Sequence, residues 1–171
     1  FIGPHLEGAK RFETMDGMKV YRFPYFYPTK YQKLAYEGGI LPNLKRSNLA
    51  KVQAPLLFLS ELYYAMKIIR QEKIDLIHSH WIIPSGLIGA ILRKVFGKKH
   101  FLTIHAAGLF TLEKIALKKK IANFIVKHCD RITVVSSYIQ ERLLNLVQSK
   151  LLNSIKNKTE IIPMGTDTVI F

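Results

Sequence analysis

The spacing of apolar residues changes repeatedly along the second half of the chain, between short continuous runs and longer stripes at helical steps. Short, bounded apolar runs are typical of buried parallel strands. Such runs occupy residues 74–80, 99–105, 131–136 and 160–162. Stripes at three- and four-residue steps predict amphipathic helices at 84–97, from 112 to about 127, and from 137 onward. Strands that alternate with such helices predict βαβ units around a parallel sheet.

The first half of the chain shows a different pattern. Asp16-Gly17 separates two extended, β-prone runs, which predicts a hairpin with a strand at about 18–23. Residues 24–50 combine prolines, paired glycines and aromatics, and we expect a long irregular segment of the kind that is usually functional. Residues from about 53 to 72 are expected to form an amphipathic helix. Its predicted apolar stripe is Leu59, Leu62, Met66 and Ile69.

These elements predict an α/β fold with a doubly wound, mostly parallel, Rossmann-like sheet. A chain of 171 residues without repeats can bury a sizeable core, so we expect one domain, residues 1–171. The apolar stretch 82–92 is broken by Pro and Gly and is shorter than the ~20 residues of a membrane-spanning helix. Cys129, the only cysteine, can form no internal disulfide. We expect it to be a small core residue in a reducing cytoplasm.

The chain is strongly basic, with 26 Lys and Arg against 12 Asp and Glu and a net charge of +14. Such an excess attracts polyanions, although a solvated basic surface has the same composition. Four lysines of the predicted helix 112–127 are expected opposite its apolar stripe: Lys114, Lys118, Lys120 and Lys127. They form either a hydrated helix face or a surface for anionic lipid headgroups. No nucleic-acid-binding module is recognised in the sequence.

Candidate chemistry is expected just beyond the strands, because ligands of open α/β sheets bind at the carboxyl ends of the strands. His80 ends one predicted strand and Trp81 follows it, while His105 ends the next strand. The small residues from position 106 to Gly108 leave room for a ligand beside His105. Neutral imidazoles there can bond a sugar hydroxyl or transfer a proton. His78, one pleat deeper, is expected to have a structural role.

The turns after the strands offer further candidates. Ser85 and Gly86 are expected in the first turn of the helix that starts near Pro84, where free N–H groups can hold a phosphate or a hydroxyl-rich ligand. Ser136 and Ser137 lack the GxSxG pattern of a nucleophile elbow and are expected to cap a helix.

A metal site is the main chemical alternative for the histidines. His78, His80 and His105 can supply three nitrogen ligands, as in zinc hydrolases. The hydrolase pattern HxHxDH requires Asp and His at positions 82 and 83, where this chain has Ile82 and Ile83. No carboxylate accompanies the histidines, so we expect no metal.

The sequence resembles the amino-terminal domain of family 4 glycosyltransferases over about residues 12–171. Four segments carry the resemblance, each at the end of a predicted strand: IDLIHSHWIIPSGLIGA, FLTIHAAGLF, DRITVVSSYIQERL and IIPMGTDTVIF. The resemblance implies one half of a two-domain GT-B architecture. It implies a retaining transferase, of the hexosyltransferase type, that moves a sugar from a nucleotide-sugar to a hydroxyl acceptor such as a glycan or glycolipid, with no cofactor and no metal.

The resemblance also implies roles for individual residues. It makes His105 the catalytic candidate, in the cleft beside the reacting sugar. It places His80, Trp81 and Pro84 on the acceptor side, and it places Gly165 and Asp167 where the chain turns toward the second domain. Together the candidate substrate-binding residues are His80, Trp81, Ser85, Gly86, Gly108, Gly165 and Asp167.

Family members also carry a first strand with a glycine-rich loop and a carboxy-terminal donor domain, and neither is found in these residues. We therefore expect a chain truncated at both ends that transfers no sugar by itself. Its expected partners are the nucleotide-sugar donor, the glycan or lipid-linked acceptor, the missing domain and, through the lysines, an anionic membrane surface, but no specific nucleic acid. The expected location is cytoplasmic, at the inner face of the membrane. A non-catalytic polyanion-binding α/β module and a zinc-dependent hydrolase are the alternatives.

Overall fold

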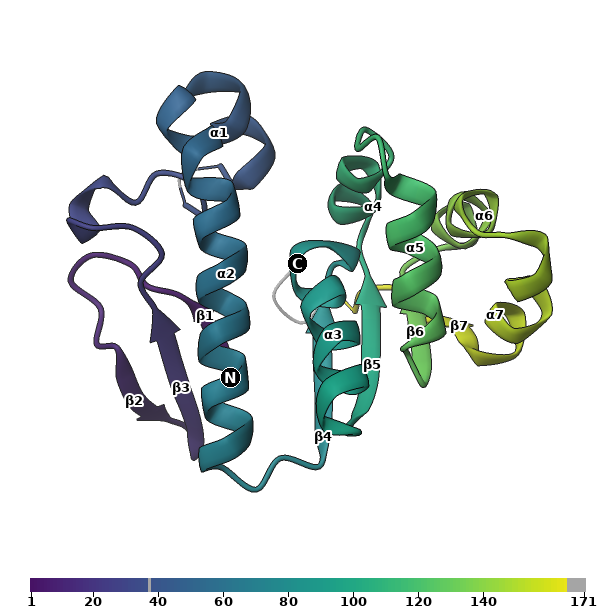
Figure 1. The fold of residues 1–171 in the computed structure, drawn as a ribbon, viewed down its shortest axis with the longest axis horizontal. Helices are drawn as coiled ribbons and strands as arrows, with labels where there is room; N and C mark the ends of the chain where they lie inside the picture. The colour runs from purple at the N-terminus through teal and green to yellow at the C-terminus, as the bar shows by residue number, and fades with distance from the viewer. Residues whose placement is uncertain (37, 166–171) are drawn as a thin grey trace. The chain divides into compact units, whose positions relative to one another are not determined.

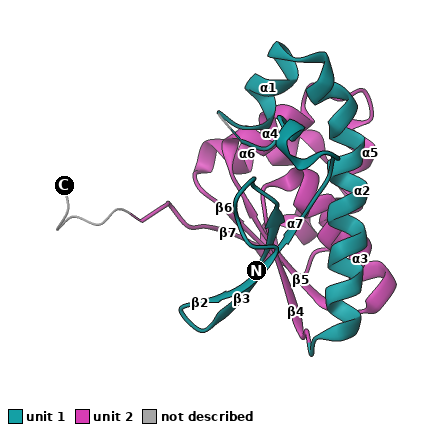
Figure 2. Cartoon of the chain, turned by 90° about the vertical axis from the view of Figure 1, so that its left-hand side faces the viewer, with its two compact units in different colours: residues 1–73 teal, residues 74–171 magenta. Residues whose placement is uncertain are grey.

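A computed structural model describes residues 1–36 and 38–165 of the chain (Figure 1). The chain divides into two compact units, unit 1 with residues 1–73 and unit 2 with residues 74–171, which Figure 2 colours separately. Each unit has its own sheet and its own hydrophobic core. The expectation of a single domain over residues 1–171 stays a prediction.

Unit 1 contains a three-stranded sheet in the order β1-β3-β2. Its strands are β1 (Ile2–Pro4), β2 (Phe12–Met15) and β3 (Met18–Phe23), with β1 parallel and β2 antiparallel to β3. The predicted hairpin is confirmed, because β2 and β3 are joined by Asp16 and Gly17 with φ values of 50° and 77°. Positive φ at both central residues defines the type I′ turn that Asp-Gly favours. The sequence pattern did not predict β1.

The segment 24–50 is more ordered than predicted. It contains a 3-10 turn (Thr29–Tyr31) and helix α1 (Ile40–Arg46), and helix α2 (Asn48–Gln71) begins before the expected start near residue 53. Ser47 caps α2, because its hydroxyl accepts a hydrogen bond from the N–H of Ala50 (3.3 Å). The cap, rather than the apolar period, sets the start of α2.

Helix α2 buries a different face from the predicted one. Its buried residues are Ala50, Gln53, Leu57 and Ala65. Leu59, expected in the buried stripe, is 59% exposed. The core of unit 1 forms between this helix and the segment that follows β3, with Phe23, Tyr25 and Leu34 buried in it. Apolar residues lie on several faces of α2, so their period predicts a helix but does not identify its buried face.

The described residues of unit 2 form a four-stranded, all-parallel sheet in the order β4-β5-β6-β7. Its strands are β4 (Leu76–His80), β5 (Lys99–Ile104), β6 (Arg131–Val134) and β7 (Thr159–Ile161). Its helices are α3 (Leu87–Phe96), α4 (Ala106–Leu112), α5 (Lys118–Lys127), α6 (Ser137–Leu146) and α7 (Leu152–Lys158) (Figure 1). The predicted α/β class with a parallel, Rossmann-like sheet is confirmed.

The helices of unit 2 share one core on one face of the sheet. Each contributes a buried apolar residue, from Ala90 of α3 to Ile155 of α7, and strands contribute residues such as Leu102. The strand order explains this arrangement, because right-handed crossovers that always step in the same direction place their helices on the same side. The opposite face of the sheet, with His78 and Thr103, lies outside this core.

The predicted helix 112–127 is wrong in its boundaries. Two helices, α4 and α5, replace it, and residues 113–117 connect them. Glu113 holds the connection, because its carboxylate pairs with Arg142 of α6 and its carbonyl oxygen accepts a hydrogen bond from Lys118 Nζ (3.0 Å). Helix α4 begins directly after His105, at the end of β5.

Other helix ends were predicted with mixed success. The predicted end of α3 at Gly97 is confirmed by its φ of 69°, the left-handed conformation of a glycine cap. The predicted start of α3 is wrong, because Pro84 lies ahead of the helix in the turn Ile82–Gly86. Ser136 caps α6, one residue before the serine of the capping-box pattern. Helix α7 was not predicted.

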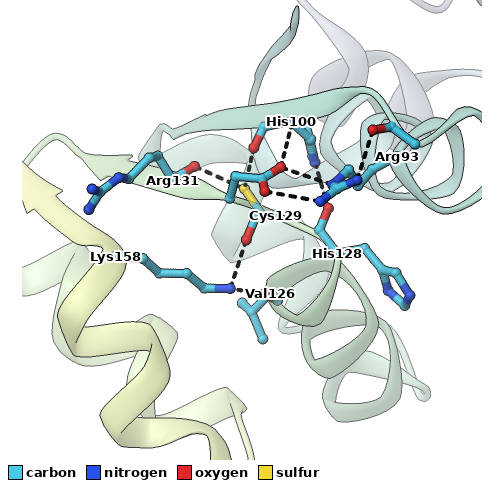
Figure 3. A network of polar contacts seen from close by, with 9 residues as sticks. Arg93, His100, Val126, His128, Cys129, Arg131 and Lys158 are labelled. Atoms are coloured by element: carbon cyan, nitrogen blue, oxygen red, sulfur yellow. Dashed lines mark hydrogen bonds and ion pairs between the residues drawn. The ribbon is translucent and has the colours of Figure 1, made fainter.

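A buried polar network lies inside unit 2 (Figure 3). The fully buried His100 of β5 faces the Ser79 hydroxyl through Nε2 (3.1 Å), and its Nδ1–H donates to the carbonyl oxygen of His128 (3.2 Å). Its backbone N–H donates to the Asp130 carboxylate (2.9 Å), which pairs with Arg93 of α3 (3.0 Å). Burial lowers the pKa of His100 to about 4, so the ring is neutral at pH 7.

Cys129 lies in the core beside this network, which confirms the prediction of a small core residue. Its thiol faces the carbonyl oxygens of His100 (3.3 Å) and Arg131 (2.9 Å). Burial raises the pKa of Cys129 to about 12, so the reactive thiolate is not formed at neutral pH. The Lys158 ammonium donates to the Cys129 carbonyl oxygen (2.8 Å) and joins α7 to the network (Figure 3).

Candidate functional site

Two histidine side chains meet where β4 and β5 end. His80 is the last residue of β4, and His105 directly follows β5. Because these strands are adjacent and parallel, their carboxyl ends lie at the same edge of the sheet. His80 Nδ1 lies 3.3 Å from His105 Nε2, and the two ring planes differ by only 23°. The structure thus brings together the two histidines that the sequence placed at strand ends.

The geometry of the pair constrains its protons. Of the two facing nitrogens, one must donate and the other accept, so they share a single proton. Burial, and then the neighbouring His80, lower the pKa of His105, which is therefore neutral at pH 7. Among the described residues, neither His80 Nε2 nor His105 Nδ1 has a hydrogen-bond partner. Both atoms can therefore bond a ligand.

Trp81 extends this edge with an unusual backbone conformation. Its φ is 66° and its ψ is 140°, a combination that costs a residue other than glycine about 1–3 kcal/mol, and such strain concentrates at functional sites. Trp81 is 48% exposed, and its ring lies edge-on to His105, with 6.0 Å between ring centroids. The Trp81 N–H donates to the carbonyl oxygen of Thr103 (2.9 Å), which fixes the residue to β5.

Two glycines of the predicted site pack against Trp81. A Cβ atom on Gly108 would lie 3.0 Å from Trp81 Cβ, and one on Gly86 would lie 2.9 Å from the Trp81 carbonyl oxygen. The Gly86 N–H, predicted to face a ligand, donates to that same carbonyl oxygen (3.0 Å). The Ser85 carbonyl oxygen accepts a hydrogen bond from the Ser79 hydroxyl (3.0 Å). Gly86 and Ser85 therefore shape the turn that holds Trp81, and Gly86 offers no free N–H.

A row of polar side chains crosses the face of the sheet that bears His80. His78 Nε2 lies 2.9 Å from Thr103 Oγ1, which lies 2.8 Å from Thr133 Oγ1 of β6. The rings of His78 and His80 are 4.6 Å apart, so the row continues to the histidine pair. Burial, and then His80, lower the pKa of His78. Thr103 and Thr133 were not predicted as site residues, although the two-residue period of a strand places them on this face.

A cavity of about 280 Å³ lies over this polar row. His78, Thr103 and Thr133 line it on the sheet side, and residues 162–165 line it on the other. Gly165, predicted from the resemblance as part of the substrate site, is therefore placed against the polar row. Asp167, the other predicted residue of this segment, lies outside the described residues.

The four predicted lysines do not form one helix face. Lys120 and Lys127 are exposed on α5, two turns apart and on the same side. Lys114 is exposed in the connection 113–117, and Lys118 Nζ is held by the Glu113 carbonyl oxygen. A lysine that was not predicted joins the pair on α5.

That third lysine is Lys94 of α3. Its Nζ lies 5.9 Å from the centre of the Phe124 ring. Phe124 lies one helical turn from both Lys120 and Lys127 on α5. We call Lys94, Lys120 and Lys127 the basic face of unit 2.

The described part of the chain offers neither a cluster of metal ligands nor a membrane-spanning helix. In residues 1–36 and 38–165, no three His, Cys, Asp or Glu side chains are placed to hold a metal ion. No described helix combines the length and the apolar character needed to cross a bilayer. The expectation of a metal-free site stays a prediction.

Comparison with known proteins places these residues in a family context. The model of the family described as Glycosyltransferase Family 4 matches residues 16–169. The chain is also similar to an uncharacterized glycosyltransferase of Methanocaldococcus jannaschii, with 27% identity over 140 residues. That match covers 82% of this chain but 37% of the relative, so the chain spans little more than a third of its length. The family match includes every described residue of the site, from His78 to Gly165.

Proposed function

This chain belongs to glycosyltransferase family 4, and on that premise we propose that it is the acceptor-side part of a retaining glycosyltransferase of the hexosyltransferase type. The whole enzyme then moves a sugar from a nucleotide-sugar donor to a hydroxyl group of a glycan or a glycolipid. In this proposal the nucleotide-sugar is a co-substrate, and the reaction uses neither a bound cofactor nor a metal.

The histidine pair beside Trp81 carries the proposal. Sugar hydroxyls both donate and accept hydrogen bonds, and His80 and His105 present one free ring nitrogen each. The exposed Trp81 ring adds a flat apolar surface with a polar N–H, which suits the mixed faces of a sugar. All three side chains lie at the sheet edge where ligands of open α/β sheets bind. In this arrangement His105 touches the reacting sugar, and His80 and Trp81 position the acceptor.

Substitution of the pair tests this role. We expect His105→Ala and His80→Ala, each made in the full-length enzyme, to lower kcat/KM for sugar transfer by at least about tenfold, the value of one lost hydrogen bond to substrate. Transfer is measured as nucleotide release over a panel of nucleotide-sugars, and product NMR gives the anomeric configuration.

The matched control is His128→Ala, which removes a histidine whose Nδ1 bonds the Phe124 carbonyl oxygen on α5, away from the pair. It should keep transfer within about twofold, in line with substitutions remote from the site. Unchanged transfer in both His105→Ala and His80→Ala would contradict the assigned roles. A product of inverted configuration would contradict the retaining mechanism.

We further propose that the basic face of unit 2 holds the enzyme at an anionic membrane surface on the cytoplasmic side. Each basic residue near such a surface adds about 1 kcal/mol of attraction. Lys120→Gln together with Lys127→Gln should therefore weaken binding to phosphatidylglycerol-containing vesicles by about 30-fold, measured by flotation.

A charge-matched control separates this face from overall charge. Lys150 and Lys156 are exposed on other elements of unit 2, and their double substitution by Gln removes the same charge. If both double variants lose vesicle binding equally, the attraction depends on net charge and the assigned face is wrong.

A further inference from the structure

Unit 1 contains a polar cavity that the histidine site does not use. Its volume is about 120 Å³. Residues 5–7, which follow β1, form one wall, and side chains between Thr29 and Tyr36, which follow β3, form the other. Since β1 and β3 are parallel neighbours, the cavity lies beyond the carboxyl ends of two parallel strands. The segment 24–50, expected from its composition to be functional, thus supplies one side of a cavity.

Buried side chains hold the walls of this cavity in place. The buried Gln32 donates through Nε2 to the His5 carbonyl oxygen (3.0 Å) and accepts from the Tyr25 N–H (2.8 Å). The fully buried Gln53 of α2 accepts from the Lys33 N–H (2.9 Å) and donates through Nε2 to the Tyr31 carbonyl oxygen (2.6 Å). Tyr36 Oη donates to the Pro4 carbonyl oxygen. The cavity is therefore formed before any ligand arrives.

The lining is rich in donors for an anion. Lys30 and Lys33 supply two ammonium groups, and Thr29 supplies a hydroxyl. Glu7 is the only carboxylate of the described lining. Neither Lys33 nor Glu7 forms an ion pair with any described residue. The Lys33 ammonium therefore remains available to a ligand, while Lys30 Nζ lies 5.2 Å from the centre of the Tyr31 ring, a weak contact that a bound anion can replace.

His5 adds an unsatisfied polar atom to this wall. The side chain is 7% exposed, and Nε2–H donates to the carbonyl oxygen of Ala9 (2.9 Å). The remaining ring atom, Nδ1, is buried and has no hydrogen-bond partner among the described residues. A buried polar atom without a partner indicates a group that the protein does not supply.

We propose that this cavity binds the phosphate group of an anionic ligand. Its volume of about 120 Å³ leaves room for a group of four oxygens, because a single water needs only ~10–15 Å³ of such a cavity. Ammonium and hydroxyl donors form charge-assisted hydrogen bonds to phosphate oxygens. His5 Nδ1 can accept a hydrogen bond from a P–OH group. The inference rests on unit 1 alone and does not depend on the proposed transferase activity.

The test measures binding of inorganic phosphate and of glycerol 3-phosphate to the full chain by isothermal titration calorimetry, at constant ionic strength over a chloride background. We expect saturable binding of at least one of the two. Lys30→Gln with Lys33→Gln should weaken it by at least about tenfold, because two charge-assisted contacts are lost. Tighter binding of the ester identifies a phosphorylated organic ligand, and tighter binding of the free ion identifies phosphate itself.

Two further variants make the test specific. Lys67→Gln removes an exposed lysine of unit 1 that does not line the cavity, and it should bind as tightly as the wild type. His5→Gln can keep a donor toward the Ala9 carbonyl oxygen while it removes Nδ1. This variant should bind phosphate more weakly than the wild type. Phosphate binding no stronger than chloride binding overturns the proposal. So does a Lys30→Gln, Lys33→Gln chain that melts at the wild-type temperature and keeps wild-type affinity.

Discussion

Gly89→Ala is expected to lower the free energy of unfolding of unit 2 by about 3 kcal/mol, the upper range for overpacking a core. Gly89 lies in α3 against the buried polar network. A Cβ atom there would lie 2.5 Å from Ser79 Oγ and 2.7 Å from His100 Cδ2, and closer still to His100 Nε2. Ala favours a helix over Gly by about 1 kcal/mol, which offsets only part of this clash. Trp81, the only tryptophan, lies in unit 2 and reports its unfolding by fluorescence in a denaturant titration.

A double-mutant cycle identifies the clashing group. In a His100→Ala background the imidazole is gone and only the contact with Ser79 Oγ remains, so adding Gly89→Ala should cost at least about 1 kcal/mol less than in the wild type. Val95→Ala, at a 60% exposed position on the same helix, should stay within about 0.5 kcal/mol of the wild type. An equal loss from Gly89→Ala in both backgrounds would show that His100 is not what excludes a side chain at position 89.

Acid should destabilise unit 2 through His100, by about 3 kcal/mol between pH 6.5 and pH 4. Burial lowers the pKa of this ring from 6.5 to about 4, although the His128 carbonyl oxygen and the Asp130 carboxylate raise it. As the pH falls through this window, the unfolded chain binds a proton that the folded chain does not. The stabilisation is therefore complete above pH 6.5 and is lost as the pH approaches 4.

The variant His100→Asn isolates this contribution. Asn can keep a donor toward the His128 carbonyl oxygen but does not titrate. Between pH 6.5 and pH 4, the free energy of unfolding of this variant should therefore fall by about 3 kcal/mol less than that of the wild type. Urea unfolding of both proteins at a series of pH values, followed by Trp81 fluorescence, gives the two profiles. His78 and His105, whose pKa values are also lowered, are present in both proteins and cancel in the comparison. Parallel profiles would rule out His100 as the acid-sensitive group.

Local signals predicted the parts of the fold that depend on local chemistry. Asp16-Gly17 predicted the hairpin because a type I′ turn depends on its own two residues. The strands of unit 2 were predicted because each contains a short, bounded run of mainly apolar residues, even though one face of the sheet bears His78, Thr103 and Thr133. The break at residues 113–117 was missed because it depends on an ion pair between Glu113 and Arg142, which are far apart in the sequence. The buried face of α2 was missed for a similar reason, since only packing selects among its apolar faces.

The candidate site was predicted in part for the same reasons. The rule that ligands bind at strand ends was sufficient to select His80 and His105. The packing of Gly86 and Gly108 against Trp81 could not be predicted from the sequence. It depends on how closely each glycine approaches the backbone or the side chain of Trp81 in the folded chain. The positive φ of Trp81 has no signal in the sequence, since bulky residues rarely adopt that conformation.

The strand order of unit 2 also has a consequence for the order of folding during synthesis. Each strand pairs with the strand made just before it, as Ile77 with His100, Leu102 with Ile132, and Ile132 with Thr159. Chains grow at about 5–20 residues per second, so a newly made strand waits only on the order of seconds for its neighbour. Pairings of such short sequence separation close quickly. The sheet can therefore be assembled strand by strand on the ribosome, and the growing edge is covered in turn by β5, β6 and β7.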